Sequence, residues 1–440
     1  MSTQELAAQV LDLASRSLPG AEVEVRVERL QSALTRFANS FIHQNVDEET
    51  VSVGLRAHRD GRTVALSTTL SDPTSLLERA AAMLALAPRD PGWPGVTAAS
   101  PLIDASYVDN AVRDCQPAER AARVNDFVQA GAGLETAGYC RTSYWAGSYR
   151  NSAGQAVDGS ATDAVMDGIA RLNGADGVAR RSSARLSDLD GVALGTRAVS
   201  SARSQANPVE LPPGRYEVIL QPEAVSDLLN NFALYGFNGK VFTEGRSFAE
   251  LDSAQFDPAI SIYDSPFEPV GGQPYDAEGT PKSRLTLVEK GITVSVTHDR
   301  RTAALANTTS TGHALAGDNW GPIPQNPGFG PGDSTLEQMI AGAERAILVA
   351  DLWYTRVLDP RLLVLTGLTR NGAWLVERGE VVGPVRNFRF TQSYPQALGP
   401  GMVLAVGSEV VPQPNRNEMY NSSAPALHLA SWNFTGGASG

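Results

Sequence analysis

The chain has 440 residues and a formal net charge of −12, from 36 lysine and arginine residues against 48 aspartate and glutamate residues. Apolar residues make up 42% of it, as in an ordinary soluble globular protein, and its length favours two or three domains over a single core. The acid excess argues against a nucleic-acid partner, because neutralising backbone phosphates requires a surplus of basic side chains.

Neither a membrane segment nor a secretion signal is expected. No apolar run reaches the roughly 18–20 residues that span a bilayer. Residues 1–17 are amphipathic and acidic, whereas a signal peptide begins with a basic region and an apolar block. We therefore interpret the two cysteines, Cys115 and Cys140, as reduced thiols of a cytoplasmic protein.

The N-terminal half predicts two α+β units, separated by a Pro/Gly-rich linker at 88–101. Apolar periodicity and turn signals place the elements of the first unit, with helices at 3–18 and 72–87 and strands at 21–34, 51–57 and 63–68. The same signals give the second unit helices at 117–131 and 187–205 and strands at 138–148 and 161–172. We assign residues 1–105 to the first domain and 106–208 to the second.

The remainder, 209–440, contains many short apolar runs between tight turn signals, which predicts a mostly antiparallel, β-rich third domain. The dipeptide Asn371-Gly372 predicts a tight hairpin. One helix is predicted at 334–348, with Ser334 as N-cap and Glu337 at the third position of a capping box. The predicted fold class is therefore α+β, with two N-terminal α+β units before this domain.

The segment 211–232 is predicted to be a strand that enters a helix. Residues 215–220 favour a strand and follow a Pro-Pro-Gly break. Pro222 suits the first helical turn, where its missing N–H costs nothing. Apolar residues then recur at helical spacing up to Phe232.

This strand, Pro-Glu-Ala-Val and Leu-Leu helix resemble the TldD/PmbA family, also called modulators of DNA gyrase. Phrases at 36–45, 276–281, 287–291 and 309–313 are also similar to the family, so the resemblance touches all three segments. In the protease branch the helix carries a His-Glu-x-x-x-His zinc motif, and the matching positions here are Pro222, Glu223 and Asp227. Because it lacks both histidines, this sequence resembles the PmbA branch, also called TldE, which is the partner subunit of the protease.

The resemblance also implies a third zinc ligand, a cysteine, in the stretch 407–417. No cysteine follows Cys140, so all three ligand positions are empty and no metal cofactor is expected in this chain. Zinc is expected in the partner subunit. Glu223 is favoured as an ordinary helix-start acid over a retained general base, because no metal is available to activate water.

The sequence gives little support for other kinds of catalytic site. None of the five histidines pairs with another at the helical spacing of metal ligands, and no Gly-x-Ser-x-Gly elbow is present. Cys140 lies in an aromatic strand, which favours a buried structural thiol. The candidate substrate-contacting residues are Thr311, Gly312 and His313, in a loop-rich segment.

The first functional hypothesis is a non-catalytic subunit of a TldD-type zinc metallopeptidase that acts on unfolded peptides. Its expected partners are a TldD-like subunit in a heterodimer, or otherwise a second copy, together with an extended peptide held at a sheet edge of the C-terminal half, for example beside 308–319. The alternatives are a stand-alone hydrolase, with a metal site from dispersed residues such as His298, His313 and Glu223, and a homodimeric peptide-binding protein.

Overall fold

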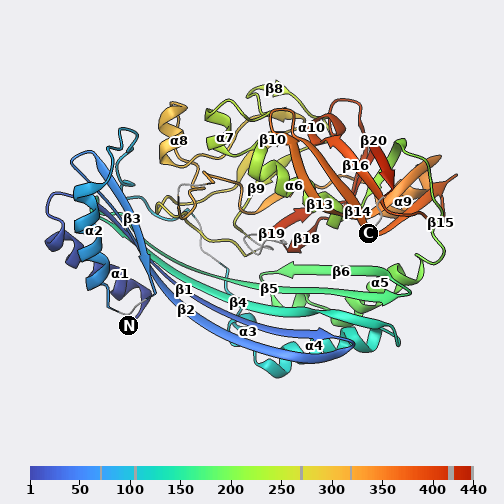
Figure 1. The fold of residues 1–440 in the computed structure, drawn as a ribbon, viewed down its shortest axis with the longest axis horizontal. Helices are drawn as coiled ribbons and strands as arrows, with labels where there is room; N and C mark the ends of the chain where they lie inside the picture. The colour runs from blue at the N-terminus through green and yellow to red at the C-terminus, as the bar shows by residue number, and fades with distance from the viewer. Residues whose placement is uncertain (70–71, 104–106, 268–270, 318–319, 415–420, 438–440) are drawn as a thin grey trace.

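The computed structural model describes residues 1–69, 72–103, 107–267, 271–317, 320–414 and 421–437. A long curved sheet forms the base of the molecule, and the β-rich C-terminal half lies above it (Figure 1). The α+β fold class and the β-rich third segment are confirmed. Among the described residues, no helix combines the length and apolar character needed to cross a membrane.

The base sheet has six strands in the order β3-β2-β1-β4-β5-β6, each antiparallel to its neighbours. The strands are β1 (Glu22–Ala38), β2 (Phe41–Arg59), β3 (Arg62–Thr68), β4 (Glu135–Asn151), β5 (Ala156–Leu172) and β6 (Ala175–Ser183). β1 pairs with β4 from Glu24 to Phe37, so the two predicted α+β units share one sheet. The boundary proposed at 105/106 lies outside the described residues.

Both groups of N-terminal helices cover one face of this sheet. Val25 and Val27 of β1 pack with α1 (Thr3–Ser17) and α2 (Thr74–Leu86) at one end. Phe37, also at an odd position of β1, packs at the other end with α4 (Pro117–Ala130) and α5 (Gly191–Arg203), near the short α3 (Asn110–Arg113) and the 3₁₀ turn η1 (Leu186–Asp188). Because side chains alternate along a strand, the even positions face the C-terminal half.

β1 and β2 extend well beyond the predicted strands. A two-residue turn at Asn39-Ser40, with φ values of 50° and 63°, joins them. Most side chains from Phe41 to Thr50 are exposed, so this part of β2 lacks the apolar alternation of a half-buried strand. β3 pairs with β2 only from Val53 onward, which leaves the first part of β2 as an edge.

The C-terminal half is built around a closed ring of five strands in the order β13-β7-β20-β16-β14, with β14 pairing back to β13. These strands are β7 (Gly214–Leu220), β13 (Arg345–Asp359), β14 (Val364–Glu377), β16 (Phe388–Ser393) and β20 (Leu427–Gly437), with β15 (Glu380–Pro384) and β17 (Val403–Val406) attached. β7 is buried on both faces: Val218 and Leu220 join the main core, and Ile219 a second cluster. A continuous apolar run suits such a strand.

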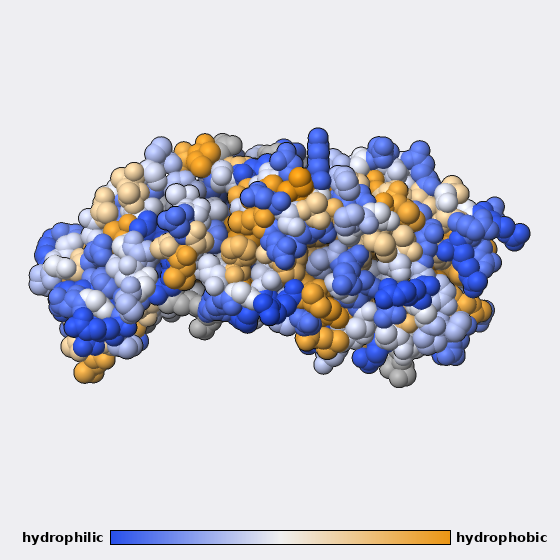
Figure 2. Space-filling view, turned by 90° about the horizontal axis from the view of Figure 1, so that it is seen from above, coloured by the Kyte–Doolittle hydropathy of each residue, from blue (hydrophilic) through white to orange (hydrophobic). Residues whose placement is uncertain are grey.

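A second sheet and several short helices complete this half. The sheet consists of β8 (Ser253–Ala254), β9 (Ile262–Asp264), β10 (Leu285–Glu289), β11 (Ile292–Thr293), β12 (Pro327–Phe329), β18 (Val411–Pro414) and β19 (Asn421–Ala424). The helices are α6 (Pro222–Asn231), which continues as a π-helical turn (Phe232–Gly236), α7 (Gly239–Thr243), α8 (Arg300–Leu305), α9 (Leu336–Gly342) and α10 (Tyr394–Ala397). α6 contacts both β13 and β19, and therefore lies between the two sheets. Seen from above, apolar side chains form separate patches among hydrophilic ones (Figure 2).

Two local predictions in this half were wrong. Asn371-Gly372 does not turn a hairpin; it lies inside β14, where both residues have positive φ and the pairing with β13 shifts register, as in a β-bulge. The helix predicted at 334–348 is only α9, capped by Thr335 with Gln338 at its third position. β13 follows α9 directly. The predicted helix was too long because periodicity alone does not distinguish a buried apolar strand from a buried helix.

A buried arginine joins the base sheet to the C-terminal half. Arg180 of β6 donates from Nε to Asp167 Oδ2 (2.8 Å) and from Nη1 to Asp351 Oδ2 of β13 (2.9 Å). Asp351 is fully buried and also accepts a hydrogen bond from Asn371 (2.9 Å). Removing one partner of a buried ion pair leaves an uncompensated charge in a medium of low dielectric constant.

We therefore expect Arg180→Met to lower the free energy of unfolding by about 3–5 kcal/mol, because two carboxylates lose their counter-charge. Arg171→Met is the matched control: Arg171 pairs with Asp176 on the same sheet but is exposed, so its loss should cost about 0–1 kcal/mol. Urea unfolding at pH 7 measures both values. Equal effects of the two substitutions would contradict a bridging role for Arg180.

Candidate functional site

The junction of β7 and α6 is formed as predicted. Gln221 is the N-cap residue and Pro222 occupies the first turn of α6. Pro222 lines a cavity of about 840 Å³ between α5, β6 and the C-terminal half. Gly407, Ser408 and Glu409 line the same cavity, so the motif and the start of the stretch expected to hold the third ligand do meet in space. Residues 415–417 of that stretch lie outside the described residues.

Glu223, the position of the general base in the protease motif, is engaged by an arginine. Its side chain is 1% exposed and its Oε1 forms an ion pair with Arg197 of α5. Glu223 Oε2 has no hydrogen-bond partner among the residues that the structure describes. The carboxylate lies in the first turn of α6, as predicted, but a guanidinium from another segment neutralises its charge.

Asp227, at the position of the second motif histidine, accepts hydrogen bonds from three protein groups. Its Oδ1 accepts from Thr355 Oγ1 (2.9 Å), and its Oδ2 accepts from Tyr394 OH (2.8 Å) and Asn231 Nδ2 (3.1 Å). Burial, and then the charge of Asp227, raise the pKa of Tyr394 well above its usual value. The phenol therefore stays protonated and serves as a permanent donor.

The residues at these positions do not fit a zinc ion. Pro222 has no donor side chain, Glu223 is paired with Arg197, and Asp227 is occupied by Tyr394 and its neighbours. Across the described ranges, no group of three histidine, cysteine, aspartate or glutamate side chains is placed to hold a metal. Protein groups instead fill the place of the motif.

The loop Thr311-Gly312-His313 is part of a buried hydrogen-bonded network. His313 is fully buried, with Nε2 3.0 Å from Asp264 Oδ2 and Nδ1 2.9 Å from Thr311 Oγ1. Both ring nitrogens of His313 thus have protein partners, which favours a structural role. Substrate contact at Thr311, Gly312 and His313 stays a prediction. His298 is bonded to Thr302 (3.1 Å), and burial lowers its pKa.

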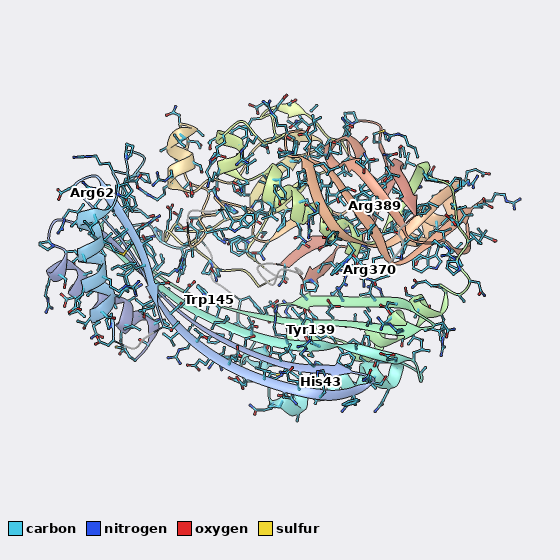
Figure 3. All side chains as sticks on the ribbon, viewed as in Figure 1. His43, Arg62, Tyr139, Trp145, Arg370 and Arg389 are labelled. Carbon is cyan, nitrogen blue, oxygen red and sulfur yellow. The ribbon has the colours of Figure 1, made fainter. Side chains whose placement is uncertain are left out.

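The sequence reasoning missed a second cavity, of about 570 Å³, between the base sheet and the C-terminal half. Trp145 and Arg141 of β4 line it, and Figure 3 shows Trp145 on the base sheet below the C-terminal half. Asp163 contacts Arg141 (3.3 Å) and accepts from Asn421 Nδ2 (2.7 Å); burial raises the pKa of its carboxyl group. The alternation of polar and aromatic side chains along β4 is the sequence pattern that could have indicated this cavity.

Cys140 is a structural thiol. It points to the helix-covered face of the base sheet and is fully buried. Burial raises its pKa to about 12. Since the thiolate is the nucleophile, the reactive form is scarce at neutral pH.

Iodoacetamide should therefore modify Cys115 of the folded chain much faster than Cys140, whose thiolate fraction at pH 8 is roughly 1 in 10,000. Peptide mass mapping after timed labelling measures the two rates. Both cysteines should react equally in urea, which is the control. Similar labelling of both in the folded chain would contradict this assignment.

Two family models match this sequence. The family model described as the PmbA/TldA metallopeptidase C-terminal domain matches residues 213–436, about half of the sequence, and the model of domain 1 matches residues 23–87. The chain belongs to the PmbA/TldD family. The family membership predicted from the sequence is thus confirmed.

Relatives of known structure cover nearly the whole PmbA/TldD-type chain. A putative modulator of DNA gyrase from Thermotoga maritima is 19% identical, with a TM-score of 0.86 over 99% of this chain and 100% of that one. TldE from Thermococcus kodakarensis is also 19% identical, with a TM-score of 0.87 over 98% and 100%. At this identity the likeness establishes a shared fold.

A curated relative matches a smaller part. A protein named metalloprotease from Methanothermobacter thermautotrophicus is 26% identical over 134 residues, which are 29% of this chain and 30% of that protein. The match thus spans less than a third of the relative's length, and supports membership of a metalloprotease-like family.

Asp227→Ala should lower the free energy of unfolding by about 2–3 kcal/mol, because Tyr394 and Thr355 lose their acceptor. Asp227→Asn keeps an acceptor oxygen and should cost distinctly less. Chemical denaturation at pH 7 gives both values. A neutral effect of the alanine substitution would show that this hydrogen-bonded cluster is not what holds α6.

Proposed function

We propose that this chain is the non-catalytic, TldE/PmbA-like subunit of a TldD-type zinc metallopeptidase complex that degrades or matures unfolded peptides in the cytoplasm. The observation that carries the proposal is the closed state of the motif positions. Pro222 lacks a donor, Glu223 is paired with Arg197, and Asp227 is bonded to Tyr394. A catalytic zinc site needs about three protein ligands and an open position.

The base sheet offers a place for an extended peptide. β2 pairs with β1 along its length, but β3 covers it only from Val53, so one side of residues 41–52 has no strand partner among the described residues. Thr50 and Ser52 from this edge line the 570 Å³ cavity beside Trp145. A peptide added as a strand would bond through its backbone and direct alternate side chains toward the cavity, without sequence specificity. This edge lies in the N-terminal sheet, whereas our sequence prediction looked to the C-terminal half.

The proposed partner is a TldD-like chain that carries the His-Glu-x-x-x-His motif and the zinc ion. The purified chain alone should bind less than stoichiometric zinc and cleave no unfolded peptide, and a TldD-like protein should co-purify when both are expressed. Elemental analysis, peptide cleavage with and without chelator, and affinity purification measure these outcomes. Stoichiometric zinc with chelator-sensitive cleavage by the isolated chain would refute the proposal.

A substitution of Glu223 in the complex distinguishes a structural role of this residue from a role as general base. Glu223→Gln keeps the shape of the side chain and an acceptor for Arg197, so we expect kcat of the complex to stay within about twofold, whereas loss of a general base costs about 10²–10⁴-fold. The equivalent glutamate of the TldD-like subunit is the matched control and should show the large loss. A large loss from Glu223→Gln would assign this chain a catalytic role.

A further inference from the structure

Three acids lie together on the edge of β2 that we propose for the peptide. Asp47, Glu48 and Glu49, which we call the acidic run, occupy consecutive positions and have exposed side chains. Of these three, only Glu49 has an ion-pair partner within the described part of the chain, Arg29 at 2.9 Å. Because side chains alternate across a strand, Glu48 lies on the cavity side of the sheet and its two neighbours lie on the other side. A strand added to this edge would thus meet negative charge on both faces.

The 570 Å³ cavity beside this edge adjoins a smaller one of about 130 Å³. We call the smaller space the annex; Glu28, Gln273, Tyr275 and Asp276 are among the residues that line it. Glu28 lines the larger cavity as well, and it pairs with Ser52 across β1 and β2, two strands away from a peptide on the edge. Two strand spacings are about 10 Å between backbones. The long side chain of a lysine or arginine on the peptide and the side chain of Glu28 can span this distance together.

The annex contains a buried hydroxyl group without a partner. Tyr275 is 1% exposed, and its OH forms no hydrogen bond with any described residue. Burial, and then the charges of Glu28 and Asp158, raise the pKa of Tyr275, so the phenol stays protonated. Buried polar groups normally have a hydrogen-bond partner. The phenol oxygen therefore marks a place where an N–H donor of a bound group fits, because a phenol accepts as well as donates.

The linings of the two spaces carry more negative than positive charge. Among the described residues that line them, the charged side chains are Glu28, Asp163, Asp276, Arg26 and Arg141. Both arginines already lie beside a carboxylate, Arg26 at 3.1 Å from Glu28 and Arg141 at 3.3 Å from Asp163, so neither offers a fresh counter-charge to an anion. A carboxylate has about four acceptor sites, which leaves Glu28 able to accept from a further donor. The balance of charge favours a cationic side chain.

We propose that the peptide on the β2 edge is basic: one lysine or arginine side chain enters the cavity toward Glu28 and Tyr275, and further basic residues lie against the acidic run. This inference deepens the proposed function and rests on its peptide site. Opposite charges on neighbouring strands stabilise their pairing. The net charge of −12 also attracts a cationic peptide over longer distances. Figure 3 places His43 and Trp145 on the same base sheet, so the edge and the cavity belong to one rigid layer.

The test is the binding of short labelled peptides to the isolated chain, measured by fluorescence anisotropy. Three unfolded peptides share one neutral sequence and differ at three alternate positions, which hold lysine, glutamine or glutamate. In about 50 mM salt we expect the lysine peptide to bind at least about tenfold more tightly than the glutamine peptide, and the glutamate peptide to bind most weakly. In about 500 mM salt the difference should shrink, because screening weakens exposed charge pairs.

Two substitutions test the cavity. Glu28→Gln and Tyr275→Phe should each weaken binding of the lysine peptide about three- to tenfold, because the cation loses a partner. Both variants should bind the glutamine peptide within about twofold of the unaltered chain, which separates a lost cation contact from a disturbed fold. Circular dichroism checks that each variant is folded. Unchanged binding of the lysine peptide by both variants would overturn the cavity assignment.

A double substitution tests the edge. Asp47→Asn with Glu48→Gln should weaken the lysine peptide about tenfold and leave the glutamine peptide nearly unchanged. Glu250→Gln with Glu380→Gln removes two exposed acids from the C-terminal half and is the matched control. An equal loss from the control pair would show an effect of net charge alone and overturn the proposal.

The outcomes distinguish this inference from the function on which it rests. Equal binding of all three peptides would overturn the basic preference and leave the edge as a peptide site. Failure of all three to bind would overturn the peptide site as well, and zinc content and co-purification test the metallopeptidase partnership separately. Displacement of the lysine peptide by an equal concentration of spermidine would overturn the proposal in favour of a small polyamine.

Discussion

The buried guanidinium of Arg180 sets how the two halves of this molecule meet. It belongs to the edge strand of the base sheet, yet one of its two carboxylate partners, Asp351, lies in the barrel. Its two hydrogen bonds fix both the distance and the angle between the layers, since a guanidinium presents its donors in a rigid plane. The cavity at Pro222 and the reach of Arg197 to Glu223 both depend on this alignment.

The region of the motif shows how the carboxylates at the start of α6 are held by side chains from other segments. A buried carboxylate without a partner is costly. The buried Glu223 is paired with Arg197, and the half-buried Asp227 accepts hydrogen bonds from Tyr394 and Thr355. Arg197 comes from α5 and Tyr394 from α10, more than twenty and more than one hundred and fifty residues away. These contacts anchor α6 to α5, α10 and β13. The helix therefore keeps its position in the core although Pro222 has no side-chain atom that could ligate a metal.

The sequence was informative where the signals are local. The strand–Pro–helix junction at Pro222 depends on a break, an N-terminal proline and a helical apolar face, and all three act within a few residues. Asn371-Gly372 misled because a pair of residues with positive φ suits a bulge as well as a turn. The partners of Glu223 and Asp227 could not be predicted, because each pairing is decided by tertiary packing. The shared base sheet was hidden for the same reason, since β1 and β4 are separated by most of the first unit.

The order of strands in the barrel bears on how the protein is made. β20 lies between β7 and β16, so the ring has a gap until residues 427–437 leave the ribosome. Until then, the apolar side chains of β7, which are buried on both faces in the finished fold, have no complete shelter. Non-local pairing of this kind forms late and slowly. From the synthesis of β7 until residues 427–437 emerge, the nascent chain is thus exposed to aggregation, and chaperone binding would matter most in that interval.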